Sequence, residues 1–253
     1  MEPTEADEEL PADVALLWGR RETGRRGPRP TLTAEDITRA ATEIADAEGL
    51  AAVSMARVAA QLGNSTMALY RHVRSKDELL ALMTDAALEY PPALSADAGW
   101  REGLTRWALL VLENARRHPW YSQLPIGGPP IGPRNLAWFD AALRTLAGTG
   151  LSEPDKVGVV MGMLTYVQGE IRLRAELSAG HAANPEAFGR RYSTLLRRLV
   201  DPRRMPALAA VVEAGVFDTD ELYDEAEADT EFLYGFALYL DGVERLVARK
   251  GAG

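Results

Sequence analysis

The stretch SMARVAAQLGNSTMALYRHVRSK, residues 54 to 76, decides the fold of this chain. Its first half has apolar residues at helical spacing and begins with a serine that suits a helix N-cap. Gly63 ends that helix, and Leu69 and Val73 then form a single apolar stripe in a second short helix. Helix, glycine-containing turn and helix are typical of the helix-turn-helix motif, whose second helix enters the major groove of DNA.

A longer helix is expected directly before this motif. Thr33 suits its N-cap, and Gly49 suits its end. The apolar residues between them follow an i, i+3, i+4, i+7, i+8 pattern and are Ile37, Ala40, Ala41, Ile44 and Ala45. Three helices of this size are enough to close a small core.

The sequence pattern of the motif resembles that of the DNA-binding domain of TetR-type bacterial transcriptional regulators. The pattern LG-x-x-x-x-x-LY-x-x-V-x-x-K is met here by Leu62, Gly63, Leu69, Tyr70, Val73 and Lys76. Three shorter segments resemble those of an actinobacterial subgroup with a TetR-type C-terminal domain. They are LLWG at 16–19, HPW at 118–120 and LDGVE at 240–244. The resemblance implies an all-α fold with an N-terminal three-helix DNA-binding domain and a larger helical domain for ligand binding and dimerisation.

Composition indicates a folded protein of the cytoplasm. The chain has 253 residues, of which 47% are hydrophobic, enough for a buried core. It has no apolar run of about 18 residues, so no membrane span is expected, and its acidic N-terminus is unlike a secretory signal. The absence of cysteine excludes disulfides and thiolate metal sites.

The net charge of −9 conceals an uneven distribution. Residues 1–19 hold six acids and no base, whereas residues 20–76 hold ten bases and six acids, a local charge of +4. A second acidic run, residues 218–231, holds eight acids and no base and is expected to form a solvated loop before the last helix. The segment expected to meet DNA is therefore locally basic.

Three regions are expected along the chain. Residues 1–30 lack a sustained period and are interpreted as a flexible arm, acidic and then basic. Residues 31–92 form the DNA-binding domain, including a fourth helix whose apolar side extends from Leu79 to Tyr90 and which Pro91 and Pro92 end. Residues 93–253 form the helical ligand-binding and dimerisation domain.

Two later helices have apolar stripes that suit a partner. One is expected from Glu153 to Ala179, and its stripe is Val157, Val160, Met161, Leu164, Val167 and Ile171. The other spans about Asp229 to Arg249, with Phe232, Phe236, Tyr239, Leu240, Val243 and Leu246. The resemblance implies that such helices from two subunits form a four-helix dimer interface. Packing of both stripes inside one subunit is the alternative.

The resemblance also implies which side chains meet DNA. The groove-facing positions are Thr66, Met67, Ala68 and Arg71. The phosphate contacts are Tyr70, His72 and Lys76, with Ser54 and Arg57 in the preceding helix. Arg71 is the best base reader, because a guanidinium pairs with guanine O6 and N7, whereas Met67 and Ala68 offer only apolar contact. An ordinary surface role is the alternative for Arg57 and His72.

The basic part of the arm is a separate candidate. Arg25, Arg26 and Arg29 lie among glycine and proline, a composition that suits a narrow minor groove. A solvated basic linker is the competing interpretation.

Aromatic residues of the larger domain suggest a pocket for a small molecule. The expected lining residues are Trp107, Trp138, Met163, Tyr166 and Gln168. Core packing is the alternative for each of them. The three histidines, His72, His118 and His181, lie on separate elements without metal-ligand spacing, so no metal site, cofactor or catalytic residue is expected.

These patterns predict a homodimeric regulator that binds an inverted-repeat operator in double-stranded DNA and is a repressor released by a small-molecule effector. The rival hypothesis is a helical protein that binds or sequesters a small molecule and has a vestigial helix-turn-helix. The net charge and the apolar pair Met67 and Ala68 favour the rival. Tyr70, Lys76 and the arginines of the arm oppose it.

Overall fold

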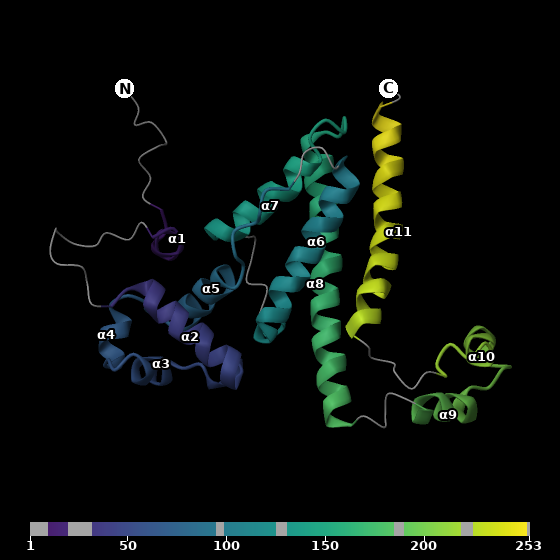
Figure 1. The fold of residues 1–253 in the computed structure, drawn as a ribbon, viewed down its shortest axis with the longest axis horizontal. Helices are drawn as coiled ribbons and strands as arrows, with labels where there is room; N and C mark the ends of the chain where they lie inside the picture. Colours follow the sequence, from purple (N-terminus) through teal and green to yellow (C-terminus); the bar gives the residue numbers. More distant parts are fainter. Residues whose placement is uncertain are drawn as a thin grey trace. The chain divides into compact units, whose positions relative to one another are not determined.

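The computed structural model describes residues 10–19, 32–94, 99–124, 131–184, 190–218 and 225–251. The described residues form helices and connecting segments, and none of them lies in a β-strand (Figure 1). The all-α fold expected from the sequence is therefore confirmed. No described helix is both long enough and apolar enough to cross a membrane.

The first helix of the DNA-binding head is α2 (Ala34–Glu48). Its start is a capping box, in which Thr33 Oγ1 accepts a hydrogen bond from the Asp36 N–H at 3.1 Å and Asp36 Oδ2 accepts one from the Thr33 N–H at 3.1 Å. The expected inward face is confirmed, since the buried residues of α2 include Ile37, Ala40, Ala41, Ile44 and Ala45.

The helix-turn-helix follows the short 3₁₀ helix η2 (Leu50–Ala52) and consists of α3 (Met55–Gln61) and α4 (Thr66–Tyr70). Gly63 has φ +63°, a left-handed conformation that favours glycine and ends α3. Ser65 caps α4 by accepting the Ala68 N–H at 3.3 Å. Leu69 and Val73 are fully buried, so the predicted inward stripe is confirmed.

Helix α5 (Lys76–Ala86) is the fourth helix of the head. Leu79 and Met83 are fully buried in the core that α2, α3 and α4 share. The expectation that Tyr90 belongs to the apolar side of this helix is wrong, because its side chain is 62% exposed. The helix ends at Ala86, so helical periodicity no longer directs Tyr90 inward.

An additional helix, α1 (Ala12–Leu17), lies within the segment expected to be a flexible arm. Leu16 is buried, α1 packs on α5, and Trp18 Nε1 donates to the Ile131 carbonyl at 2.9 Å. The interpretation of residues 1–30 as arm throughout is therefore wrong for residues 12–18. A six-residue helix is too short for its periodicity to be recognised, and its partners lie far along the chain.

Three further elements complete the packing around the head: α6 (Gly99–Arg117), the 3₁₀ helix η4 (Pro119–Gln123) and α7 (Pro133–Thr145). Trp120 and Leu124 belong to the same buried core as α2 and α5. Asp46 of α2 accepts the Trp120 indole N–H at 2.6 Å, and His118 Nδ1 lies 2.8 Å from the same carboxylate oxygen. The HPW segment thus docks on α2.

The chain divides into two compact units, residues 1–167 with 250–253 and residues 168–249. Helices α8 (Glu153–Ala183) and α11 (Glu225–Gly251) each run from one unit into the other. This division leaves the head joined to the helices that follow it, because α5 packs on both α2 and α7. In the first unit, Lys250 Nζ binds Asp155 Oδ2 at 3.1 Å. In the second, Arg174 Nη1 binds Asp229 Oδ1 at 3.0 Å.

The stripe expected on α8 is buried along one edge only. Val160, Val167 and Ile171 are buried, whereas Val157 and Met161 are 41% and 47% exposed. Residues 157 and 161 lie at the exposed edge of the stripe and residues 160 and 167 at its buried edge, so packing inside one subunit accounts for only part of it. On α11 the predicted residues Phe232, Phe236, Leu240 and Val243 are buried, and Tyr239 and Leu246 are half-buried.

The second unit also contains α9 (Arg190–Leu199) and α10 (Pro206–Glu213). Asp218, at the start of the acidic run, binds Ser193 and Arg197 of α9. The expectation that the whole run is a solvated loop is wrong, since α11 begins at Glu225 and Asp229 is paired. Residues 219–224 lie outside the described part of the chain.

Candidate DNA-binding interface

The outer face of α4 displays the side chains that the sequence assigned to DNA. Leu69 is fully buried and fixes the rotation of this short helix. Met67 is then 70% exposed and Tyr70 is 43% exposed, while Thr66 and Ala68 are half-buried. A methionine and a tyrosine on the surface of a helix anchored by one leucine form an exposed apolar and aromatic surface with a hydroxyl at its edge.

Three basic residues follow on the turn that leads into α5. Arg71, Arg74 and Lys76 are exposed, and the described residues contain no acidic partner within salt-bridge distance of any of them. Lys76 is the first residue of α5. A turn with three solvated cations beside the exposed face of α4 is suited to bind a phosphate backbone.

Arg74 was missed in the sequence analysis. The family pattern names Val73 and Lys76 but neither of the two positions between them, so the resemblance gave no reason to choose Arg74. The backbone fixes this turn, because the Arg74 N–H donates to Glu78 Oε2 at 2.6 Å. Its charge and position next to a buried valine were the available signal.

The residues assigned to DNA on α3 also have structural roles. Ser54 Oγ accepts the Arg57 N–H at 3.2 Å as the N-cap of α3. The Arg57 guanidinium binds Glu48 Oε1 at 2.6 Å and Gln61 Oε1 at 3.3 Å. Gln61 in turn donates to Glu43 Oε2 at 3.0 Å, so this network fastens α3 to α2. A phosphate contact by Arg57 has to compete with Glu48.

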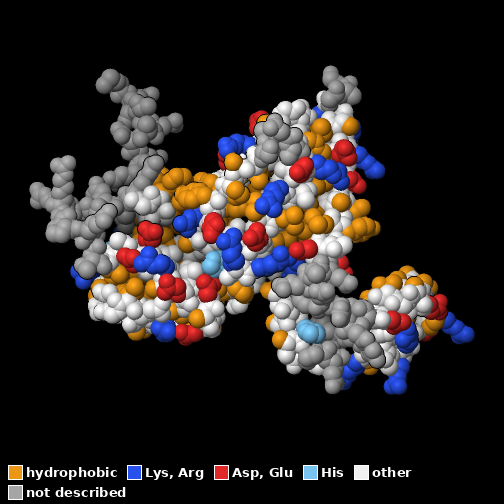
Figure 2. Space-filling model, in the orientation of Figure 1, with side chains coloured by type: hydrophobic (Ala, Val, Ile, Leu, Met, Phe, Trp, Pro, Cys, Tyr) orange, Lys and Arg blue, Asp and Glu red, His pale blue; other side chains and the backbone are white. Residues whose placement is uncertain are grey.

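The remaining candidates for DNA binding are less well defined by the structure. His72 is half-buried and takes part in an interaction within the chain. The arginines of the arm, Arg25, Arg26 and Arg29, lie outside the described residues. Charged side chains of both signs are mixed over the visible face of the head (Figure 2). The local charge alone therefore does not define an interface there, and the exposed turn after α4 carries the argument.

The two tryptophans of the expected pocket are packed against each other in the first unit. Trp107 and Trp138 are 1% and 3% exposed, and their rings meet edge to face with centroids 5.6 Å apart. Trp107 Nε1 donates to the Trp138 carbonyl at 2.8 Å, and Trp138 Nε1 donates to the Glu89 carbonyl at 2.6 Å. Both indole N–H groups are thus used inside the protein, so these rings can offer a ligand only apolar surface.

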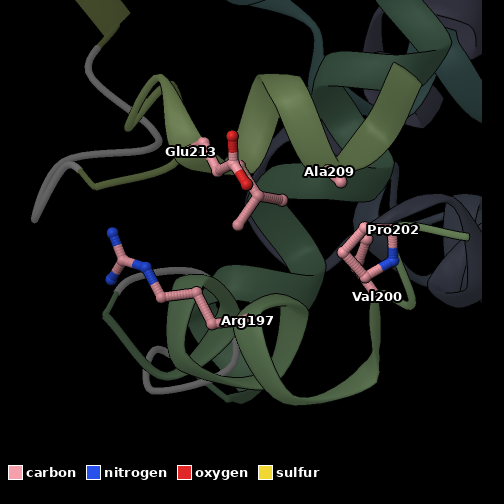
Figure 3. Close-up of a pocket in the computed structure, with 6 residues that line it drawn as sticks. Arg197, Val200, Pro202, Ala209 and Glu213 are labelled. Carbon is pink, nitrogen blue, oxygen red and sulfur yellow. The ribbon is translucent and has the colours of Figure 1, made fainter. Parts of the chain in front are cut away.

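The other residues of the expected lining are on α8. Met163 is fully buried, Tyr166 is half-buried, and Gln168 is half-buried at the start of the second unit. A cavity of about 230 Å³ lies elsewhere, between α9 and α10, with Arg197 and Glu213 on opposite sides (Figure 3). Because Arg197 is already bound to Asp218 and the cavity is wide open, we assign it no role.

The exposed α4, the basic turn and the buried head core define a helix-turn-helix DNA-binding protein. Comparison with known proteins identifies its family. Residues 37–83 match the family described as bacterial regulatory proteins, tetR family, and residues 91–247 match the tetracyclin repressor-like C-terminal domain. The chain belongs to the TetR family of transcriptional regulators.

Two curated relatives illustrate the similarity. The HTH-type transcriptional repressor DrrR1 of Streptomyces coeruleorubidus is 35% identical over 98% of this chain and 90% of that protein. The tetracycline repressor protein class A from transposon 1721 of Escherichia coli is 29% identical over 86% of this chain and 94% of that protein.

A solved structure shows the same fold. The Streptomyces coelicolor TetR family protein ActR, crystallised in complex with actinorhodin, superposes with a TM-score of 0.70 at 24% identity. The match covers 86% of this chain and 99% of that one.

Proposed function

We propose that this protein is a homodimeric repressor that binds an inverted-repeat operator and is released from it by a small molecule. The observation that carries the proposal is the exposed surface of α4 together with the unpaired cations of the turn that follows. Met67 and Tyr70 are exposed above a buried Leu69, and Arg71, Arg74 and Lys76 extend the surface. The relative DrrR1 is named a transcriptional repressor, which supports repression over activation.

Within this surface the roles divide by chemistry. Arg71 is the base reader, since its guanidinium can form two hydrogen bonds to guanine. Tyr70 and Lys76 position the head on phosphates, and Arg74 joins them. Thr66, Met67 and Ala68 face the groove, where the exposed thioether and methyl groups can contact thymine methyls.

The small molecule acts through its differential affinity for two arrangements of the heads. Only a ligand that binds one arrangement more tightly than the other shifts the equilibrium between them. We propose Trp107, Trp138, Met163 and Tyr166 of the first unit as residues that shape its site, with the two tryptophans as an apolar wall. We assign no catalytic residue and place the protein in the cytoplasm, where its operator is.

The proposal is tested by selection from random duplex DNA. The full chain is incubated with a randomised duplex library, bound DNA is recovered over several rounds, and the enriched sequence is titrated in direct binding assays. We expect an inverted repeat whose half-sites are separated by about one helical turn or a multiple of it, because a two-fold dimer presents two recognition helices. Binding without sequence enrichment, or no binding, would favour the rival hypothesis of a vestigial motif.

A further inference from the structure

A buried carboxylate joins the helix that carries the DNA-binding head to the start of α7. Asp85 is the penultimate residue of α5 and is only 7% exposed. Its Oδ1 accepts the backbone N–H of Arg134 at 3.1 Å and that of Asn135 at 3.0 Å. The same oxygen also accepts the Asn135 side-chain amide at 3.0 Å.

These are the hydrogen bonds that an N-cap side chain ordinarily makes. The first turn of a helix has backbone N–H groups without partners in the helix, and the residue at the N-cap position usually satisfies those of the second or third residue. In α7 the N-cap position is Gly132, which has no side chain, and the first residue is Pro133, which has no N–H. Asp85 therefore acts as the missing cap, supplied by another helix.

The glycine at this position is required by the contact. A Cβ on Gly132 would lie 2.1 Å from Asp85 Oδ1 and 2.6 Å from its Cγ, far closer than atoms pack. Glycine is thus the residue that lets the carboxylate reach the amides of α7, and Gly132 and Asp85 form a matched pair. A negative charge also interacts favourably with the N-terminus of a helix.

Further contacts surround the same junction. Trp18 of the segment after α1 donates to the carbonyl of Ile131, the residue before Gly132. Trp138, on α7, donates to the carbonyl of Glu89, three residues after the end of α5. The end of α5 and the beginning of α7 are therefore held together by side chains from both helices and by the N-terminal segment.

On its other side, α5 is part of the DNA-binding head. Leu79 and Met83 are fully buried in the head core, and Lys76 at the start of α5 is a proposed phosphate contact. The eleven residues of α5 thus carry a DNA contact at one end and Asp85 near the other.

We propose that Asp85 is a positioning residue that fixes the DNA-binding head to α7 through the N-terminal amides of that helix. In this role it sets the orientation of the head in the absence of ligand.

The test measures the orientation of the heads without needing a ligand. The chain has no cysteine, so Met67→Cys gives one nitroxide label on the exposed face of α4 in each subunit. The labelled chain serves the distance measurement alone, and operator affinity is measured on unlabelled proteins that keep Met67. Pulsed electron paramagnetic resonance then reports the distance distribution between the two heads. Amide hydrogen exchange at residues 134 and 135 reports the cap directly, and light scattering with thermal unfolding checks that the dimer remains folded.

Four variants separate the cap from other effects. Asp85→Ala removes all the acceptors, and Gly132→Ala displaces the carboxylate while keeping it in the chain. Asp85→Asn retains an oxygen at Oδ1 and should keep the cap on α7, since asparagine is as good an N-cap as aspartate. Asp140→Ala is the control, because Asp140 is an exposed carboxylate of α7 whose one partner among the described residues is Arg144, four residues along the same helix.

We expect Asp85→Ala and Gly132→Ala to broaden the distance distribution, to speed exchange at residues 134 and 135, and to lower operator affinity about tenfold, the equivalent of 1.4 kcal/mol. Asp85→Asn and Asp140→Ala should resemble the wild type. The inference is overturned if Asp85→Ala or Gly132→Ala forms a folded dimer with an unchanged distance distribution. It is equally overturned if Asp85→Asn changes the distance distribution and the exchange rates as much as Asp85→Ala does. Loss of the cap would then not explain the effect of Asp85→Ala. Failure of the wild type to bind any operator would count against the proposed function and leave the distance measurement valid.

Discussion

Single side chains on the turn after α4 are proposed to set how tightly the head binds the phosphate backbone of DNA. Arg74 is exposed, lies between Arg71 and Lys76, and has no acidic partner in the described part of the chain. Each phosphate that a cation neutralises steepens the slope of log affinity against log salt by about 0.9. The substitution is present in both subunits of the dimer, so Arg74→Ala should weaken binding to all duplexes alike and make the slope shallower by about 1.8.

The matched control for Arg74 is Arg106→Ala, which removes an exposed arginine from α6 and leaves the head unchanged. Titration of both variants at several salt concentrations distinguishes a phosphate contact by Arg74 from the general effect of removing one positive charge. An Arg74→Ala slope equal to that of Arg106→Ala would show that Arg74 stays in solvent when the head is bound to DNA.

The capping box at the start of α2 makes part of the stability depend on pH. The Thr33 hydroxyl, and then the Arg39 guanidinium at 2.5 Å, hold the pKa of Asp36 below its ordinary value. A carboxyl whose pKa is lower in the folded state contributes stability above the unfolded value of about 3.9, and this contribution is lost as the pH falls through the folded pKa. Thr33→Ala should cost about 1 kcal/mol at pH 7 as a lost N-cap.

The measurement is urea unfolding of wild type and Thr33→Ala at pH 7 and at several values below pH 4. We expect the difference between the two proteins to shrink in acid, because protonated Asp36 no longer accepts the hydrogen bonds of the box. A difference that is constant over this range would mean that the Thr33 hydroxyl stabilises α2 without the carboxylate.

Local side-chain patterns could be predicted from the sequence, and contacts between distant residues could not. The N-caps Thr33 and Ser54 and the helix end at Gly63 were predicted correctly, because caps and left-handed glycines act within a few residues. The partners of Asp85 lie 49 and 50 residues away, so no local rule signals its role. For the same reason, Trp107 and Trp138 were chosen for their aromatic character, and their mutual hydrogen bond was not foreseen.

Among the elements, α1 illustrates how a short helix derives its stability from its neighbours. Leu16 is 7% exposed, whereas Leu10, just before the helix, is 43% exposed. Removing a buried leucine costs about 2 kcal/mol or more, and an exposed one costs little. Leu16→Ala should therefore free α1 from α5, and Leu10→Ala should not.

Limited proteolysis checks this prediction, with cleavage between residues 10 and 19 as the readout. Faster cleavage in Leu16→Ala than in wild type is expected, with Leu10→Ala unchanged. Equal cleavage of all three proteins would mean that α1 is not held by the burial of Leu16.

The long helices α8 and α11 show that an apolar stripe predicts burial, but does not predict whether the same subunit or a second subunit covers it. Val243 belongs to the stripe expected at a dimer interface and is only 5% exposed within one chain. The apolar residues that α11 leaves exposed are others, with Tyr234 at 71% and Leu238 at 57%. Packing inside one subunit is therefore confirmed for Val243, and a dimer interface at the exposed apolar residues of α11 stays a prediction.

Leu238 is therefore the residue whose substitution tests dimerisation without damaging the subunit. Leu238→Glu should give folded monomers by light scattering, because a charge at an apolar interface loses its solvation. The control is Val216→Glu, which places a charge at a residue that is 60% exposed and follows α10. A dimeric Leu238→Glu protein would place the interface elsewhere, and a Val243→Glu variant should unfold instead.

Over the whole molecule, an acidic protein binds an acidic polymer because its charge is unevenly distributed. The net charge is −9, yet residues 20–76 carry +4. The acids outside the head oppose non-specific binding, so sequence recognition has to come from a few groups on α4 and the turn after it. The central claim is that these groups divide into one base reader and several phosphate contacts.

The most direct test is a competition assay with every single-base variant of the selected operator, carried out on wild type, Tyr70→Phe, Lys76→Ala and Arg71→Ala. Tyr70→Phe and Lys76→Ala should weaken binding to all variants alike. Arg71→Ala should cost about 1–3 kcal/mol at one base pair of each half-site and relax the base preference there. If Arg71→Ala instead loses affinity with an unchanged base profile, Arg71 is a phosphate contact and the division of roles proposed for α4 is contradicted.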